Sequence, residues 1–289
     1  MELSKEILQK IKKFQRQEIT GSIIYKRLSE IQKNEANKEI LRKISLEEAK
    51  HYEIYKKYTG TDVKPDRFII FINMLFARIL GPTFIIRLLE RKEDEAQDDY
   101  QVALQLPEIP KIIEQEEEHE EILLGMLKEE RINYLGSVVL GLNDALVELT
   151  GALAGLTFAL QKANLIALTG LITGIAAAFS MGASEYLSTK SEETERNAVK
   201  ASIYTGVAYI FTVALLILPF LILNNIYISL SLTLLGAVLV IAVFNYYYAV
   251  VKKETFGHRF GEMILLSFGV ALLSFGVGYL LRIFFDLDM

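Results

Sequence analysis

The sequence predicts an all-α protein in which a four-helix bundle is followed by a membrane domain of five helices. Through the first 130 residues, apolar side chains recur at the helical period, and strand-like alternation is absent from the sequence. The polar composition then changes. Residues 1–134 hold 26 acidic and 23 basic side chains, whereas residues 135–289 hold only 10 and 8. We therefore expect a soluble domain at 1–130 and a membrane domain at 131–289.

The composition excludes several classes of protein. The chain contains no cysteine, which excludes disulfides, thiolate metal sites and thiol catalysis. Its net charge of −5 offers no basic surface for nucleic acid. The first residues, MELSKEILQKIKKFQRQE, lack the apolar core of a signal peptide, so we expect the soluble domain to stay in the cytoplasm.

Four helical segments account for the soluble domain, with a long second connection between them. Gly60 and Pro65 end the second segment, and Gly81-Pro82 predicts a break or kink within the third. Pro107 precedes the fourth. The expected bounds are 3–33, 37–58, 68–106 and 111–130.

The third segment begins with an apolar stretch, residues 68–89. Its first run, Phe68–Leu80, has thirteen residues and is too short to span a bilayer. It fits a buried crossover helix, a dimer interface or a surface that lies on the membrane. We favour packing against another subunit or against the membrane face.

The motif Glu-x-x-His occurs twice in the soluble domain, at Glu48 and at Glu116. Side chains three residues apart project from one face of a helix, so each pair can bind one metal ion. Each motif follows a Glu that lies seven residues before a Tyr. One Glu from each of two helices, with Glu-x-x-His from two others, is the ligand set of di-iron and di-manganese bundles. The candidate ligands are Glu18, Glu48, His51, Glu93, Glu116 and His119.

Three further residues have two interpretations each. Glu90 lies three residues before Glu93 and is either an additional ligand or a surface charge. Tyr25 and Tyr100 are candidates to hydrogen-bond the ligand carboxylates, or else core aromatics with a buried hydroxyl. A single Glu-x-x-His in so acidic a helix also fits a solvated surface. Two copies that use two of the three histidines favour a metal site.

Residues 10–130 resemble the rubrerythrin-type branch of the ferritin-like proteins, on the two Glu-x-x-His motifs and the two Glu…Tyr pairs given above. The resemblance implies a di-iron centre that binds ferrous iron and oxidises it with oxygen or peroxide. The rubredoxin-like cysteine module of a full rubrerythrin is missing. Peroxidase turnover is therefore not expected, and ferroxidase activity of this domain remains an open prediction beside plain iron binding.

Polar residues within the first two apolar segments indicate a second metal site. A carboxylate inside a bilayer costs about 2.5–3.5 kcal/mol on insertion scales, so its default interpretation is functional. Asp144 and Glu148 are four residues apart on one helical face, and Met181 and Glu185 repeat that spacing. If the two faces oppose each other, they form a site with several oxygen ligands and one sulfur ligand. Such a site suits a divalent first-row metal. The five expected spans are about 135–160, 165–187, 201–223, 228–250 and 261–284.

The membrane half resembles the vacuolar iron transporter family over its whole length. The resemblance is carried by Gly141-Leu-Asn-Asp144 in the first span and by the stretch SMGASEYLS, which begins at Ser180, in the second. It implies a dimeric, proton-coupled carrier that moves ferrous iron, sometimes manganese, out of the cytoplasm. Asp144 and Met181 fall on the pore-lining metal and proton positions of the family, with Glu148 and Glu185 beside them.

The chain departs from the family after the second span. Eukaryotic members have a long Glu-rich insert there that collects metal, whereas here about a dozen residues, including Glu192 and Glu193, separate the spans. We expect these two residues to receive metal from the cytoplasm and the soluble domain to take over the collecting role. The two halves together resemble the membrane-bound ferritins, which join the same modules in the same order.

The loops predict the orientation in the membrane. Basic residues gather in 188–200 and 251–260, whereas 161–164 and 224–227 hold only Lys162. The positive-inside rule places the soluble domain in the cytoplasm and the C-terminus outside a multi-pass cell-membrane protein.

These observations predict an exporter of Fe²⁺ or Mn²⁺, driven by protons across the lipid bilayer and assembled as a homodimer. The cofactor expected in the soluble domain is a di-iron centre, or its manganese equivalent, because the ligands accept both metals. Two other classes stay open. One is a membrane-anchored ferroxidase or peroxide scavenger, and the other is a Mn²⁺ carrier gated by an iron-sensing domain.

Overall fold

The computed structural model describes residues 5–100, 106–126, 133–192 and 196–284, with the side chains of residues 6, 92–100, 124 and 126 outside that description. All secondary structure in this part of the chain is helical, as the sequence predicts. Contacts divide the chain into two units. We call residues 1–128 with 250–254 the N-terminal unit, and residues 129–249 with 255–289 the membrane unit.

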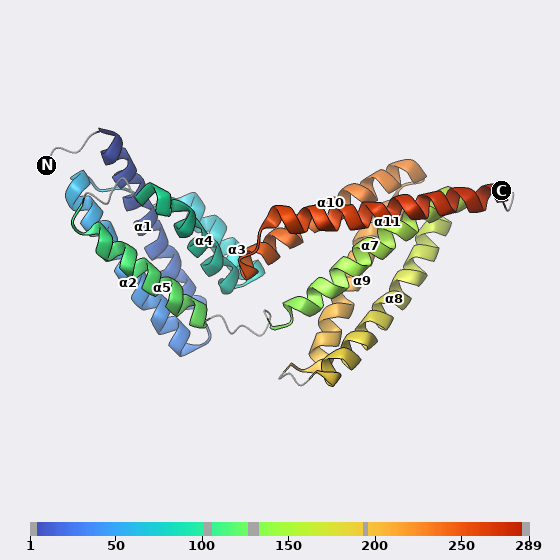
Figure 1. Ribbon diagram of the computed structural model, residues 1–289, viewed down its shortest axis with the longest axis horizontal. Coiled ribbons are helices and arrows are strands. Elements are labelled where there is room, and N and C mark those ends of the chain that lie inside the picture. The colour runs from blue at the N-terminus through green and yellow to red at the C-terminus, as the bar shows by residue number, and fades with distance from the viewer. Residues whose placement is uncertain (1–4, 101–105, 127–132, 193–195, 285–289) are drawn as a thin grey trace. The chain divides into compact units, whose positions relative to one another are not determined.

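The N-terminal unit contains five helices in the described part of the chain. Helix α1 packs along α2, α2 on α5, α5 on α4 and α4 on α1, so that these four form a ring, while α3 packs on α1 and α4 (Figure 1). Ile11, Phe14, Tyr55, Leu106 and Ile112 are among the buried apolar residues that hold the ring together. The helices are α1 (Lys5–Ile31), α2 (Glu35–Thr59), α3 (Arg67–Leu80), α4 (Pro82–Tyr100) and α5 (Ile109–Met126).

The expected third segment is two helices rather than one. Asp66 caps α3 by accepting hydrogen bonds from the backbone N–H groups of Phe68 and Ile69. The helix ends at Gly81, whose φ of 97° is rarely adopted by other residues, and Pro82 starts α4. The predicted break at Gly81-Pro82 therefore makes α3 an element of its own.

Within the described residues, the membrane unit contains five helices that are long and apolar enough to cross a membrane. They confirm the five predicted spans and indicate a multi-pass membrane protein. The first has the expected bounds, whereas the second continues to Ser191 rather than ending near residue 187. They are α7 (Leu135–Leu160), α8 (Ala163–Ser191), α9 (Ala198–Ile222), α10 (Ile226–Lys252) and α11 (Phe256–Phe284).

Small residues let α7 approach its neighbours closely. A Cβ atom added to Gly141 would lie 2.3 Å from the carbonyl oxygen of Thr205 on α9. One added to Gly278 on α11 would lie 2.3 Å from the carbonyl oxygen of Gly155. The Thr205 hydroxyl also donates a hydrogen bond of 2.9 Å to the Ser137 carbonyl across the same α7–α9 contact. The backbone of α7, which carries two of the candidate acids, is therefore closely packed against the backbones of α9 and α11.

Candidate functional site

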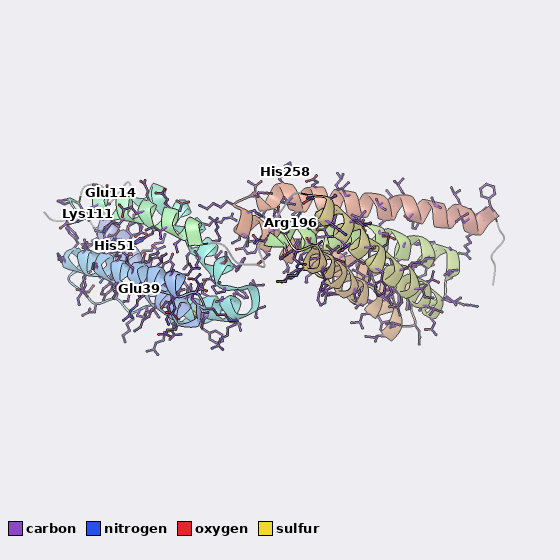
Figure 2. The ribbon with its side chains drawn as sticks, turned by 90° about the horizontal axis from the view of Figure 1, so that it is seen from below. Glu39, His51, Lys111, Glu114, Arg196 and His258 are labelled. Carbon is purple, nitrogen blue, oxygen red and sulfur yellow. The ribbon has the colours of Figure 1, made fainter. Side chains whose placement is uncertain are left out.

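The N-terminal unit brings together candidate ligands that are far apart in the sequence. Helix α1 provides Glu18, α2 provides Glu48 and His51, and α5 provides Glu116. One ligand atom from each of these four lies within 4.8 Å of the others, which is the spacing expected around a metal ion. Figure 2 marks His51, which is buried, and Glu114 on α5, which is exposed.

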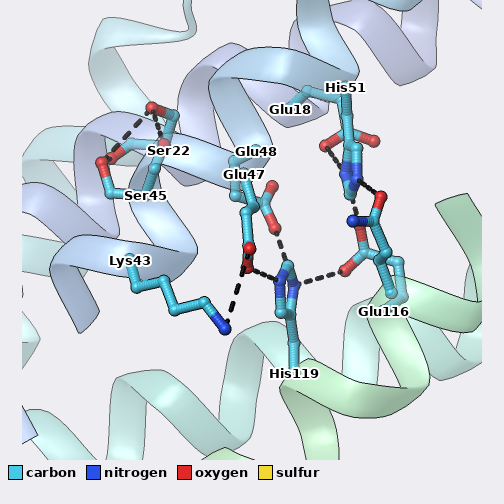
Figure 3. Close-up of polar contacts among 10 residues, drawn as sticks. Glu18, Ser22, Lys43, Ser45, Glu47, Glu48, His51, Glu116 and His119 are labelled. Carbon is cyan, nitrogen blue, oxygen red and sulfur yellow. Dashed lines mark hydrogen bonds and ion pairs between the residues drawn. The ribbon is translucent and has the colours of Figure 1, made fainter. Parts of the chain in front are cut away.

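Glu116 contacts both histidines of the cluster (Figure 3). One of its carboxylate oxygens lies 2.9 Å from Nδ1 of His51, and the other lies 3.4 Å from Nδ1 of His119. Oε2 of Glu18 lies 3.5 Å from Nδ1 of His51, and Oε1 of Glu48 lies 3.7 Å from Nδ1 of His119. Through Nδ1, each histidine thus faces the shared Glu116 and one further carboxylate, and these are donor groups that would hold a divalent metal ion.

The other ring nitrogen of each histidine is held by a residue that the sequence analysis missed. Nε2 of His51 lies 3.1 Å from Oε1 of Gln115, and Nε2 of His119 lies 2.7 Å from Oε2 of Glu47. Both partners directly precede the Glu of a Glu-x-x-His motif, and each orients the histidine of the other motif. Such contacts fix the ring orientation of a metal-ligating histidine. The polar residue directly before each Glu-x-x-His motif is the sequence feature that could have identified these two partners.

The cluster is buried and its polar atoms converge. Glu18, Glu48, His51 and His119 are each at most 4% exposed. Among the described residues, Oε2 of Glu18, both carboxylate oxygens of Glu116 and Nδ1 of both histidines make no hydrogen bond. Buried polar atoms without hydrogen bonds are costly, and a divalent cation at this position would compensate them. Carboxylate and imidazole donors suit Fe²⁺ and Mn²⁺, so the residues fit the metals expected from the sequence.

Burial and charge act in opposite directions on the ionisable groups. Burial by itself lowers the pKa of His51, but contacts with Glu116 and Glu18 outweigh it and raise that pKa to about 10. Burial likewise opposes the charged form of His119, yet Glu116 and Glu47 raise its pKa. Burial would raise the pKa of Glu116, but the two histidines lower it to about 2. At pH 7 His51 therefore carries a proton beside an ionised Glu116.

A buried tyrosine adjoins the cluster. The pKa of Tyr55 is raised by burial first and then by the charges of Glu18, Glu116 and Glu48, and its hydroxyl makes no hydrogen bond among the described residues. The sequence analysis did not identify Tyr55, although it follows His51 by one helical turn. Tyr25 is buried on α1, as a residue supporting the ligands or the core would be.

The candidates on α4 are only partly described. Glu90 is buried and lies 3.0 Å from the guanidinium of Arg87, outside the group of four ligands that share one position. Burial, the largest effect, raises its pKa. The side chains of Glu93 and Tyr100 lie outside the described part of the structure. The contribution of Glu93 and Tyr100 on α4 to the site therefore remains a prediction.

Two of the four candidates in the membrane unit, Glu148 and Glu185, accept hydrogen bonds from different helices. The Tyr209 hydroxyl donates a hydrogen bond of 2.7 Å to Glu148, and the Ser137 hydroxyl donates one of 2.6 Å to Glu185. Ser137 precedes Glu148 by eleven residues, which is about 16 Å along α7. Glu185 and Glu148 therefore lie at different positions along the axis of α7. The described residues contain one group of three or more clustered His, Asp or Glu ligands, and it lies in the N-terminal unit.

Met181 lies between these two positions. Helices α7 and α8 are joined by two residues and run in opposite directions, and Glu185 is level with Ser137. One turn back along α8, Met181 is therefore level with about residue 141, one turn from Asp144. Met181 is half-buried against the apolar core of the membrane unit, and Asp144 is half-exposed. Glu148, four residues further on, is exposed in the single chain.

The acidic residues after α8 are partly described. Glu192 is exposed and lies 2.5 Å from the guanidinium of Arg196, so it is paired rather than open. Glu193 lies outside the described residues. Their expected role in receiving metal from the cytoplasm remains a prediction.

The comparisons with known proteins bear on the membrane unit. Residues 135–199 match the VIT family. This region covers α7, α8 and the loop that follows, and it contains all four candidates of the membrane unit. Together with the five apolar helices, the match indicates a membrane metal-ion transporter. No curated protein and no solved structure matches the chain. The ferritin-like assignment of the N-terminal unit rests on the residue pattern alone.

Proposed function

We propose that the chain exports Fe²⁺ from the cytoplasm by proton antiport, accepts Mn²⁺ as an alternative cargo, and first binds the metal in its N-terminal unit. The observation that carries the proposal is the pairing of two features in one chain. A buried group of three carboxylates and a histidine lies within 4.8 Å in the N-terminal unit, and a VIT-family region covers the first two spans.

The N-terminal unit acts as the collecting site in this proposal. Glu18 and Glu48 provide carboxylate oxygens, His51 and His119 provide imidazole nitrogens, and Glu116 bridges between them. Bound iron at such a site supplies redox chemistry with oxygen, which is the basis of the proposed ferroxidase activity. The chain's own contribution is to hold the two histidines in fixed orientation and to exclude water from the ligands.

The membrane unit acts as the pathway. Asp144 provides an oxygen ligand and Met181 a sulfur ligand, about one helical turn apart along the axis of α7. Glu148 lies further along this axis on one side of the pair and Glu185 on the other, so the two extend the polar pathway. Protons and divalent cations compete for carboxylate oxygens. Protonation from the outer side would therefore release the cargo outward and return the carrier in the protonated state.

A homodimer is part of the proposal. Glu148 is exposed and Asp144 is half-exposed on the surface of a single membrane unit. A carboxylate that faces lipid is costly, whereas one that faces a second copy across a polar pathway is not. We place the translocation pathway between two copies for this reason.

The test is metal flux in proteoliposomes that contain the purified protein, with and without a pH gradient. We expect Fe²⁺ flux that depends on the gradient. Asp144→Asn should abolish the flux and leave metal binding in the N-terminal unit unchanged, whereas Glu116→Gln should weaken that binding. Normal flux in the Asp144→Asn variant would show that the pathway assignment is wrong.

A membrane-anchored ferroxidase is the second candidate, and the buried carboxylate and histidine cluster favours it. It predicts iron-dependent oxygen or peroxide consumption that survives Asp144→Asn, in a protein without flux of either metal. A Mn²⁺ carrier gated by an iron-sensing unit would instead show Mn²⁺ flux whose iron dependence disappears in Glu116→Gln.

A further inference from the structure

Helix α3 presents an unusual surface. Its face toward the ring carries Ile70, Asn73 and Ala77, which are buried. The opposite face is also apolar, and three of its side chains, Phe68, Phe71 and Ile79, are more than 60% exposed. We call this opposite face the α3 face; it consists of Phe68, Ile69, Phe71, Leu75, Phe76 and Ile79.

The α3 face concentrates the apolar exposure of its unit. Elsewhere in the described part of the N-terminal unit, the large apolar side chains that are exposed are Ile31, Leu46 and Ile122, one on each of three helices. Single exposed residues of this kind are normal, whereas a contiguous apolar patch marks an interaction site. The exposure of Phe68, 72%, matches that of Leu272 on the membrane-spanning helix α11, 71%.

The covalent structure keeps this unit near a bilayer. Helix α5 ends at Met126, and the first membrane span begins at Leu135. The eight residues between them reach at most about 30 Å, whatever their conformation. Helix α3 itself has 14 residues and a length of about 21 Å, less than the ~30 Å needed to cross the hydrocarbon layer. A lipid contact of α3 would therefore be parallel to the membrane surface.

Charge distinguishes a lipid surface from a second copy of the chain. Exposed cations flank the α3 face, with Lys64 and Arg67 before it and Arg78 near its end. Anionic headgroups would pair with all three. An antiparallel pairing of two α3 helices would instead bring the arginines of the two copies together, and the acidic residue beside them, Asp66, is engaged by the backbone N–H groups of Phe68 and Ile69.

We propose that α3 is an interfacial helix that lies in the headgroup region of the membrane and docks the metal-binding unit on the bilayer through the α3 face. Phe68, Phe71 and Ile79 enter the lipid, and the flanking cations contact anionic headgroups.

The absence of cysteine from the chain makes the test direct. Phe71→Cys and Ile79→Cys are introduced separately into the full-length protein, which is labelled with an environment-sensitive fluorophore. The protein is reconstituted in vesicles of phosphatidylcholine and phosphatidylglycerol, with brominated phosphatidylcholine as the quencher. Glu39→Cys, on the exposed side of α2 (Figure 2), is the aqueous control, and Leu272→Cys is the lipid control.

We expect the loss of fluorescence at positions 71 and 79 to approach that at 272 and to exceed that at 39 several-fold. Omission of the anionic phosphatidylglycerol should reduce the quenching at positions 71 and 79. Quenching as weak as at position 39 would overturn the proposal, and disulfide formation between unlabelled Phe71→Cys copies without lipid quenching would assign the face to a second copy. Circular dichroism and metal binding show that each variant is folded. The measurement involves no flux, so its result is independent of the proposed transport.

Discussion

Glu116 contacts two histidines through the two oxygens of one carboxylate, and these contacts shift the pKa values of all three groups. The imidazoles gain a negative neighbour and the carboxylate gains two positive ones, so the pKa of His51 rises while that of Glu116 falls. A metal ion at the same place must displace the imidazole protons, because a ligating imidazole is neutral. Metal binding and proton release are therefore coupled at this site.

Metal binding at pH 7 should release protons, and the affinity should rise with pH toward the pKa of His51. That pKa is about 10, so the imidazole is protonated at pH 7, whereas Glu116 with a pKa of about 2 is already ionised and releases none. Calorimetric titration with Mn²⁺ in buffers of different ionisation enthalpy measures the release. His51→Ala should release fewer protons, and a heat independent of the buffer would contradict the expectation.

The outer contacts of the histidines should matter nearly as much as the ligands. Gln115→Leu removes the partner of Nε2 of His51 and keeps the side chain volume. We expect a loss of metal affinity of about 10–100-fold, the usual effect of removing such a contact. Glu114→Gln, on the exposed side of α5, is the matched control and should bind normally. Equal affinity of both variants would show that Gln115 has no positioning role.

At the scale of the helix, the periodicity of apolar residues and the spacing of polar ones were sufficient to predict much of the structure. The apolar repeat predicted the helices, and the i, i+3 spacing of Glu and His predicted which residues would share a face. Sequence spacing could not predict Gln115 and Glu47, because each contacts a histidine on a different helix and depends on how α2 and α5 are rotated. The same holds for Tyr209, which reaches Glu148 from α9 across the helix packing.

The close contact between α7 and α9 leads to a prediction for the membrane unit. Gly141→Ala would place a methyl group 2.3 Å from the carbonyl oxygen of Thr205, so the two helices must separate. We expect a destabilisation of about 1–3 kcal/mol, typical of overpacking. Thermal unfolding in detergent micelles measures it. Gly269→Ala, which meets no atom within 4 Å, should leave the unfolding temperature unchanged, and an equal loss in both variants would count against the contact.

At the scale of the whole molecule, the chain consists of two units with separate sources of stability. The N-terminal unit encloses a buried cluster of carboxylates and imidazoles, and the membrane unit is built around an apolar core. Ligand binding stabilises only the structure that forms the site. Removal of metal should therefore affect one unit and spare the other.

Chelation should lower the unfolding temperature of the N-terminal unit by about 5–10 °C, starting from protein with metal at roughly a hundred times its Kd. Hydrogen exchange locates the effect. Peptides from α1, α2 and α5 should lose protection with chelator, and peptides from α9 should not. The Glu116→Gln variant should respond little to chelator, and uniform loss of protection in both units would disprove their independence.

The order of the two units along the chain has a consequence for biosynthesis. The described ligands lie between Glu18 and His119, and the first membrane span begins at Leu135. The N-terminal parts of a nascent chain fold first. The ribosome therefore completes every described candidate ligand before it completes any segment that spans the bilayer. A chain arrested ahead of α7 would already contain these candidate ligands, so under the proposed function metal loading would precede insertion of the membrane unit.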